Sequence, residues 1–192
     1  MGTEIRPLTS ERWRDLVDLF ADRGTVRECW CMWFRRPRKE WGEQAGAGNR
    51  RAMQSIVRRN EIPGLLAYLD GKAVGWCSVS PRERYGSLER SRVLKRVDDK
   101  PVWSIVCFYV VPTERNKKVA ESLLGAAVSY AAENGAEIVE AYPLDRRDDR
   151  LPDGDAFTGP LTMFKRAGFK EVARNTPNRP IVRFSVAKFL KV

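Results

Sequence analysis

The hydrophobic pattern of the chain alternates between strand-like and helix-like periods. Two apolar runs, residues 64–70 (GLLAYLD) and 73–80 (AVGWCSVS), flank the turn dipeptide Asp70-Gly71, which predicts a β-hairpin. Residues 102–111 are apolar at nearly every position, as is typical of a central strand that is buried on both faces. The remaining strand-like segments are residues 4–8, 136–142, 169–174 and 181–189.

Helical spacing is clearest after Ser10, a residue type that is favoured as an N-cap. Trp13, Leu16 and Phe20 then fall on one face of a helix that ends before Gly24. Residues 29–48 are aromatic and basic without a clear period, which predicts a long loop or a broken helix. Further helices are predicted over residues 49–60, 117–133 and 161–167, and partly over residues 88–97 within the charged connection 82–100.

The order of these elements predicts a mixed fold: a strand, two helices, three strands, a helix, a strand, a helix and two strands. The chain has no internal repeat, low-complexity tract or linker between them. We therefore expect a single domain of the α/β (α+β) class over residues 1–192.

Composition and charge narrow the classes of function. The 43% apolar residues are enough for a real core, and a net charge of +10 favours either polyanionic partners or a solvated basic surface. The amino-terminal segment is charged where a signal peptide is apolar, and no apolar run has transmembrane length, so we expect a cytoplasmic protein with no membrane association. The sequence has no His, which excludes Ser-His-Asp and Cys-His catalysis.

The four cysteines predict no metal site. Cys77 and Cys107 lie inside apolar runs and are expected to be core thiols. Cys29 and Cys31 flank a single Trp, and the set lacks the paired C-x-x-C spacing of zinc knuckles. Reduced thiols beside a pocket are the interpretation that fits a cytoplasmic chain.

The stretch VVPTERNKKVAESLL, residues 110–124, leaves the central strand through a basic turn and enters an amphipathic helix. Such a turn places free backbone N–H groups and the positive end of the helix dipole at one point, which suits an anion. Arg115, Lys117 and Lys118 add charge, and Ala120 keeps one position small. The turn alone fits a phosphate cradle and an ordinary basic helix cap equally well.

In the whole order of elements, this turn resembles the diphosphate loop of the GNAT superfamily of acetyl-CoA-dependent N-acyltransferases, whose pattern is Gln/Arg-x-x-Gly-x-Gly/Ala. Val110 to Pro112 fit the end of the preceding strand, Arg115 the first motif position and Ala120 the last, whereas Lys118 replaces the central glycine. Residues 163–172 (MFKRAGFKEV) resemble the family's helix-to-strand segment. The stretches CWCMWF and DAFTG are similar to those of some bacterial members.

The resemblance implies a mostly antiparallel sheet of about seven strands, flanked by helices and split between the fourth and fifth strands. It implies transfer of an acetyl group from acetyl-CoA, as co-substrate, to a primary amine of a small molecule or an amino terminus, by a monomer or homodimer. Backbone amides would hold the pantetheine arm at Phe108, Tyr109 and Val110. The diphosphate would be held by Arg115, Asn116, Lys117, Lys118, Val119 and Ala120.

The family's usual proton donor, a Tyr, is replaced here by Phe164, and a frequent Asn by Phe157. By resemblance, Tyr109 or Tyr142 would have to protonate the leaving thiolate. Near the end of the fifth predicted strand, the two candidate general bases are Glu140 and Asp145; a solvated strand face and a hydrated turn explain them as well.

The acceptor pocket is predicted at the aromatic amino-terminal segment. Cys29, Trp30 and Trp33 could wall a pocket for a small organic amine, although aromatic residues at this density also form plain core. Two other functions remain open: a catalytically weak or inactive GNAT-like binding or regulatory module, and a tRNA-associated acyltransferase. Because the basic residues are scattered and no RNA motif is present, the sequence disfavours nucleic acid as a partner.

Overall fold

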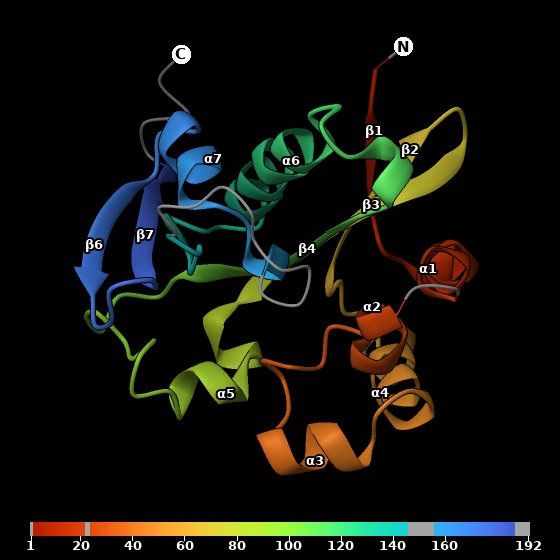
Figure 1. The fold of residues 1–192 in the computed structure, drawn as a ribbon, viewed down its shortest axis with the longest axis horizontal. Helices are drawn as coiled ribbons and strands as arrows, with labels where there is room; N and C mark the ends of the chain where they lie inside the picture. Colours follow the sequence, from red (N-terminus) through yellow and green to blue (C-terminus); the bar gives the residue numbers. More distant parts are fainter. Residues whose placement is uncertain (1, 22–23, 146–155, 187–192) are drawn as a thin grey trace.

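A computed structural model describes residues 2–21, 24–145 and 156–186 of the chain (Figure 1). One seven-stranded sheet has the order β1-β2-β3-β4-β5-β7-β6, and every neighbouring pair is antiparallel except β4 and β5. This arrangement confirms the predicted mixed, mostly antiparallel sheet. The strands are β1 Glu4–Pro7, β2 Gly64–Leu69, β3 Lys72–Pro81, β4 Trp103–Val110, β5 Ile138–Ala141, β6 Lys170–Arg174 and β7 Pro180–Ser185.

Most of the predicted helices are present, and the aromatic segment follows the broken-helix alternative. Residues 29–48 form a broken helical region, in which α2 and α3 are separated by turns. In the part of the chain that the structure describes, no helix is both long and apolar enough to cross a bilayer. The α-helices are α1 Trp13–Phe20, α2 Gly24–Cys29, α3 Arg38–Glu43, α4 Ala47–Arg58, α5 Gly86–Glu89, α6 Val119–Glu133 and α7 Leu161–Arg166.

The helix predicted over residues 88–97 is wrong, because α5 ends at Glu89 and the chain continues without regular structure to the start of β4. The carbonyl groups of Leu88 and Leu94 accept hydrogen bonds from Arg82 Nη2, at 3.3 and 2.7 Å. The buried guanidinium of Arg82 thus holds two turns of the connection in place. The apolar residues of the connection pack in this local cluster and do not form one face of a helix.

Two helices cover opposite faces of the sheet at β3. A Cβ added at Gly75 would lie 3.0 Å from Val119 Cγ1 and 3.1 Å from Leu123 Cδ1, so the missing side chain lets α6 approach the strand. The next residue, Trp76, packs edge-on against Phe20 of α1, with ring centroids 6.3 Å apart. Successive strand residues point to opposite faces, which places α6 and α1 on either side of the central sheet.

The sheet is split where β4 and β5 diverge. These parallel strands pair only over Trp103–Ile105 and Val139–Ala141, while β3 pairs with β4 as far as Val110. The carboxyl-terminal half of β4 therefore has one edge outside the described sheet pairing. This confirms the expected split between the fourth and fifth strands. In Figure 1, α2, α3 and α4 gather at the lower right, away from α7, β6 and β7 on the left.

Candidate functional site

A cleft of about 1640 Å³ follows the open edge of β4 and joins the two regions that the sequence marked. At one end lie residues of the turn before α6, and at the other end lie the aromatic amino-terminal segment and α5. The far wall comes from the region before α7. Residues predicted to bind a cofactor and residues predicted to bind an acceptor therefore line one continuous space. Among the former, the lining set is Phe108, Tyr109, Val110, Arg115, Asn116, Lys118, Val119 and Ala120.

The turn before α6 has a backbone that suits glycine although it contains none. Asn116 and Lys118 have φ values of 66° and 61°, in the left-handed region, and Lys118 is the N-cap residue of α6. A residue other than glycine in this conformation costs about 1–2 kcal/mol. Alternating left-handed turns of this kind aim successive N–H groups at one point, and the positive end of the α6 dipole adds to them. Asn116 and Lys118 thus adopt the backbone conformation that glycine usually takes in such a turn.

The side chains at this end leave excess positive charge. Glu114 is paired with Lys117 at 2.9 Å, and Glu121 with Arg166 at 2.6 Å. Arg115 Nε donates a hydrogen bond to the carbonyl oxygen of Val110, at 3.4 Å. Both carboxylates beside the turn are thus matched by cations, and the side chain of Lys118 is exposed at the cleft. The local charge favours an anionic ligand.

The amino-acid sequence of this chain matches a known protein family. Residues 16–150 match the model of the acetyltransferase (GNAT) family. This chain belongs to the GNAT acetyltransferase family. A search of curated protein sequences finds no match.

Solved structures share the fold of this GNAT protein. The PaiA N-acetyltransferase from Thermoplasma acidophilum, in complex with coenzyme A, is 17% identical, with a TM-score of 0.54 over 96% of this chain and 99% of that one. An N-acetyltransferase from Staphylococcus aureus Mu50 is 14% identical, with a TM-score of 0.55 and coverages of 97% and 99%. An agmatine N-acetyltransferase mutant is 12% identical, with a TM-score of 0.57 and coverages of 96% and 100%.

The aromatic segment of this GNAT protein contributes some of its predicted acceptor residues to the cleft. Cys29 and Trp33 line it, whereas Trp30 is buried in the core and stacks on Trp13 with centroids 5.8 Å apart. Trp30 and Cys31 have φ values of 46° and 53°. Around these two left-handed residues the chain buries Trp30 in the core, while Cys29 and Trp33 on either side line the cleft.

Trp33 lies at the centre of the aromatic end of the cleft, where the acceptor pocket was predicted. Its ring meets Trp41 edge-on with centroids 4.7 Å apart, and the guanidinium of Arg38 lies 3.4 Å from its ring centre. Phe157, which stands where relatives often carry Asn, packs against the same ring at 6.3 Å. A cation stacked on an indole face is a favourable arrangement, and it leaves the guanidinium edge available for hydrogen bonds.

The cysteines near the acceptor end are neutral thiols. Burial, and to a smaller extent the adjacent Cys31, raise the pKa of Cys29 to about 11. The pKa of Cys107 is raised by its contact with Cys31, whose Sγ lies 3.4 Å away, and by burial. Neither is an activated nucleophile at neutral pH. Within the described ranges, no group of three or more His, Cys, Asp or Glu side chains is arranged to hold a metal ion.

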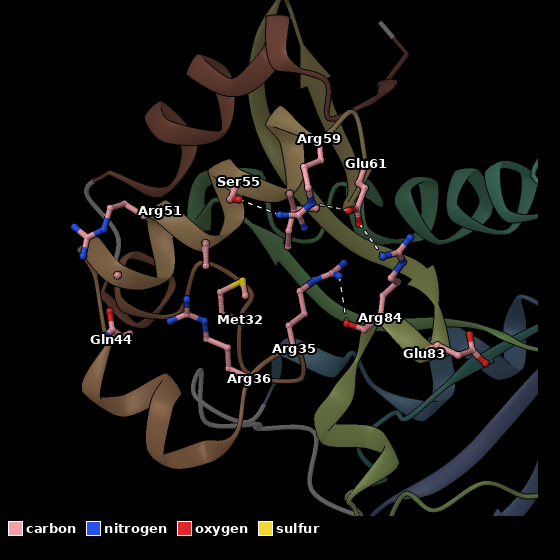
Figure 2. Close-up of a pocket in the computed structure, with 13 residues that line it drawn as sticks. Met32, Arg35, Arg36, Gln44, Arg51, Ser55, Arg59, Glu61, Glu83 and Arg84 are labelled. Atoms are coloured by element: carbon pink, nitrogen blue, oxygen red, sulfur yellow. Dashed lines mark hydrogen bonds and ion pairs between the residues drawn. The ribbon is translucent and has the colours of Figure 1, made fainter.

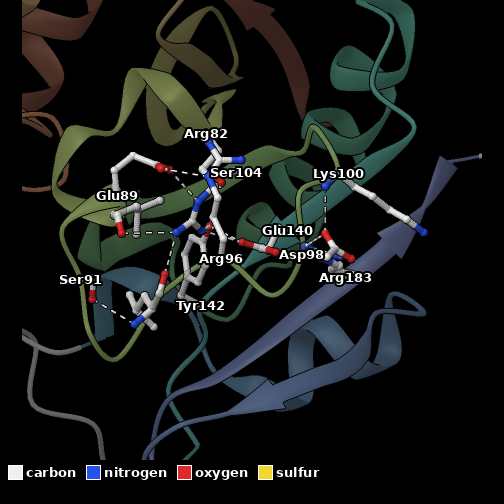
Figure 3. A network of polar contacts seen from close by, with 12 residues as sticks. Arg82, Glu89, Ser91, Arg96, Asp98, Lys100, Ser104, Glu140, Tyr142 and Arg183 are labelled. Atoms are coloured by element: carbon white, nitrogen blue, oxygen red, sulfur yellow. Dashed lines mark hydrogen bonds and ion pairs between the residues drawn. The ribbon is translucent and has the colours of Figure 1, made fainter.

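Glu140 and Tyr142 lie outside the cleft lining, in a buried polar network that Figure 3 shows. Glu140 is fully buried, and its carboxylate accepts hydrogen bonds from Arg82 Nη1 at 2.8 Å, Arg183 Nε at 2.8 Å and the Tyr142 hydroxyl at 2.6 Å. Burial and the negative charge of Glu140 raise the pKa of Tyr142. Ser104 on β4 contacts the same hydroxyl at 2.8 Å. The network joins β4, β5 and β7.

Asp145 also lies outside the cleft lining. Its carboxylate pairs with Arg174 at 2.7 Å, and its backbone N–H donates to the carbonyl of Asn178. Of the four residues predicted for catalysis, Tyr109 is the one among the cleft-lining residues; its ring packs edge-on against Phe20 with centroids 5.8 Å apart, and its hydroxyl is buried. Phe164, at the position of the family's usual Tyr, is fully buried and packs edge-on against Phe108 with centroids 6.0 Å apart. That position therefore presents no hydroxyl.

Part of the cleft was not predicted from the sequence. Helix α5 and the residues after it contribute Ser87, Arg90 and Ser91, and the loop before β7 contributes Arg179. Arg179 donates a hydrogen bond to Thr158 Oγ1 at 2.8 Å. The charged connection contains a sequence signal, since three closely spaced polar residues lie within and just after the short α5, but the direction of their side chains depends on the Arg82 contacts described above.

Proposed function

We propose that this protein transfers the acetyl group of acetyl-CoA to a primary amine of a small molecule or an amino terminus. The observation that carries the proposal is the single cleft that connects the left-handed turn at Asn116 and Lys118 with the aromatic wall at Trp33. A diphosphate at one end and an amine at the other would be separated by the open edge of β4, along which an extended pantetheine arm can pair.

The residues present fit acetyl-CoA. The first backbone N–H groups of α6 and the cations Arg115 and Lys118 suit the diphosphate, because such groups have no helical partner and face a positive dipole end. Main-chain groups of successive strand residues point to alternate edges, so those of Phe108 and Val110 face the split, on the side that β5 does not pair, whereas those of Tyr109 point toward β3. The groups that face the split suit the amide groups of the pantetheine arm, in the manner of an added strand.

Transfer would proceed by direct attack of a neutral amine on the thioester carbonyl. A backbone N–H of the β4 edge would stabilise the oxyanion, and Tyr109 would give a proton to the departing thiolate. Among the described residues that line the cleft, the carboxylates are Glu114 and Glu121, both ion-paired at the diphosphate end. We infer that the amine loses its proton to solvent, so kcat/KM should rise with pH toward the amine's own pKa.

Two measurements test this function. Acetyl-CoA at one hundred times its dissociation constant should stabilise the fold by about 2.7 kcal/mol in a thermal unfolding experiment. A panel of primary amines, with release of free CoA thiol as the readout, should then identify an acceptor whose kcat/KM rises with pH. Failure of acetyl-CoA to shift unfolding at millimolar concentration would reject the proposal.

One observation favours a second function, a CoA-binding module without turnover. Phe164 is buried where relatives carry a proton donor, so the thiolate would leave without help unless Tyr109 serves. Under this alternative, acetyl-CoA would bind and stabilise the fold while no amine increased thiol release. The two readouts of the preceding experiment therefore separate the two functions.

A further inference from the structure

A second cavity, of about 660 Å³, lies behind the acceptor wall of the cleft (Figure 2). It is bounded by α4, by the residues that precede β2 and by the short turn after β3. Arginine dominates its lining, and the five are Arg35, Arg36, Arg51, Arg59 and Arg84. In Figure 2, Glu61 lies between Arg59 and Arg84 on one side, Arg35 and Arg36 lie near the centre, and Arg51 lies on the opposite side.

Residues 32–37 form a partition between this cavity and the cleft. Trp33, Phe34 and Pro37 line the cleft, whereas Met32, Arg35 and Arg36 line the second cavity. The two spaces share one stretch of main chain but no lining side chain. The second cavity is therefore a separate site rather than an extension of the acetyl-CoA cleft.

The charges in the cavity are unequally matched. Glu61 is held by Arg59 at 2.9 Å and Arg84 at 3.3 Å, and the hydrogen bond from Arg59 lowers its pKa. The other lining carboxylate, Glu83, turns to Arg96 at 3.0 Å, and Arg96 is not among the lining residues. Both acidic groups are thus engaged by arginines, while three of the lining arginines keep an excess of positive charge.

Those three arginines have donors to spare. Arg35 Nη2 donates to Ser80 Oγ at 3.0 Å and to the carbonyl of Pro63 at 3.4 Å, but its buried Nε has no hydrogen-bond partner in the described chain. Arg36 donates to Asn49 Oδ1 at 3.4 Å and reaches Glu40 at 3.4 Å, and both of these partners lie outside the lining. Arg51 is exposed and takes part in no ion pair among the described residues.

We propose that this cavity binds a phosphate-bearing small molecule. Guanidinium groups present planar pairs of N–H donors that match phosphate oxygens two at a time, and they remain charged at every physiological pH. The volume lies within the range of small-molecule sites, roughly 300–1,000 Å³. A lining of arginine, with carboxylates already paired, suits a compact polyanion and disfavours an apolar ligand. The proposal does not depend on acetyl transfer.

Isothermal titration at low ionic strength tests the site with inorganic phosphate, pyrophosphate and ADP as probes. We expect pyrophosphate to bind more tightly than phosphate, and its affinity to fall at least about tenfold in Arg51→Gln and further in Arg36→Gln/Arg51→Gln. Arg14→Gln is the matched control, because Arg14 is an exposed arginine on α1 paired with Asp18 and the change in net charge is the same. Tighter binding of ADP would identify a nucleotide ligand, and equal binding would identify the diphosphate alone; both results support the site.

The proposal would be overturned by no heat from any probe, by equal weakening in the Arg14→Gln control, or by complete competition by CoA. The first excludes a phosphate site, the second indicates general charge attraction, and the third moves the binding to the cleft. Binding of an RNA oligonucleotide that requires Arg51, without binding of the small probes, would also contradict it. Arg51 is exposed, so its substitution leaves the fold intact and the result interpretable.

Discussion

Arg82 and Glu140, 58 residues apart in the sequence, form a fully buried ion pair with 2.8 Å between Arg82 Nη1 and Glu140 Oε1. Glu140 lies opposite Ser104 in the short parallel pairing of β4 and β5. The pair therefore fixes the closed end of the split, where the two strands still lie side by side. Beyond that point they diverge and the cleft begins.

This pair predicts a large loss of stability for Glu140→Ala. The substitution leaves Arg82 and Arg183 buried near one another without their shared carboxylate, and breaking a buried pair in this way costs about 3–5 kcal/mol. Urea unfolding of the two proteins measures the difference. Glu137→Ala, at an exposed carboxylate on the neighbouring turn, should change the free energy of unfolding by less than about 0.5 kcal/mol. Equal small effects at both positions would contradict the structural role.

The two tyrosines predicted for catalysis should behave differently. Tyr109→Phe removes the proposed proton donor, and we expect kcat to fall about 10²-fold while the KM for acetyl-CoA stays the same. Tyr142→Phe removes hydrogen bonds of 2.6 Å to Glu140 and 2.8 Å to Ser104, and should lower the free energy of unfolding by about 1–3 kcal/mol. Steady-state kinetics and urea unfolding of both variants check this. A large kcat effect at Tyr142 alone would reverse the assignment.

Lys118 should both strain the backbone of the turn and increase the affinity for acetyl-CoA. Lys118→Gly relieves a left-handed residue and should stabilise the fold by about 1 kcal/mol, while loss of a charge-assisted contact to phosphate should weaken acetyl-CoA binding about tenfold. Lys118→Asn separates the two effects, because Asn tolerates the same φ but carries no charge. Calorimetric titration with acetyl-CoA gives the affinities. Tighter binding in both variants would instead mean that the lysine side chain obstructs the cleft.

Cys29 should react slowly at neutral pH. Burial raises its pKa to about 11, so the thiolate fraction and the rate of alkylation by iodoacetamide should rise about tenfold per pH unit between pH 8 and about 10. Mass spectrometry of the labelled peptide measures the rate, with Cys29→Ser as the blank. Saturating acetyl-CoA should slow labelling, since Cys29 lines the cleft. A rate that is already at its plateau at pH 7 would contradict the burial argument.

The hydrophobic pattern predicted the sheet and most helices because each element buries one regular stripe. In α6, for example, Val119, Leu123 and Ala127 are buried at helical spacing. The split of the sheet and the position of the predicted cofactor site were inferred from the resemblance to the GNAT family, because only the order of elements indicates which strand edges diverge. The buried place of Glu140 could not be predicted, because its partner Arg82 is remote in sequence. The core position of Trp30 could not be predicted for another reason, because no local sequence pattern indicates that a Trp adopts a left-handed φ.

Cys107 shows the same difficulty on a smaller scale. An apolar strand run predicted a core thiol, and Cys77 is fully buried, but Cys107 lines the cleft and faces Cys31 at 3.4 Å. Period-two alternation gives the face on which a strand residue lies. The alternation does not indicate whether the face that carries Cys107 is buried at the point where β5 diverges from β4.

The left-handed lysine at position 118 has a consequence for how genomes are surveyed. An anionic ligand at such a turn contacts the backbone N–H groups, so their direction matters more than the side chain. A residue other than glycine can hold the N–H groups in that direction. A filter that requires glycine at this point discards such chains before their shape is considered. Screening on dihedral angles would recover them.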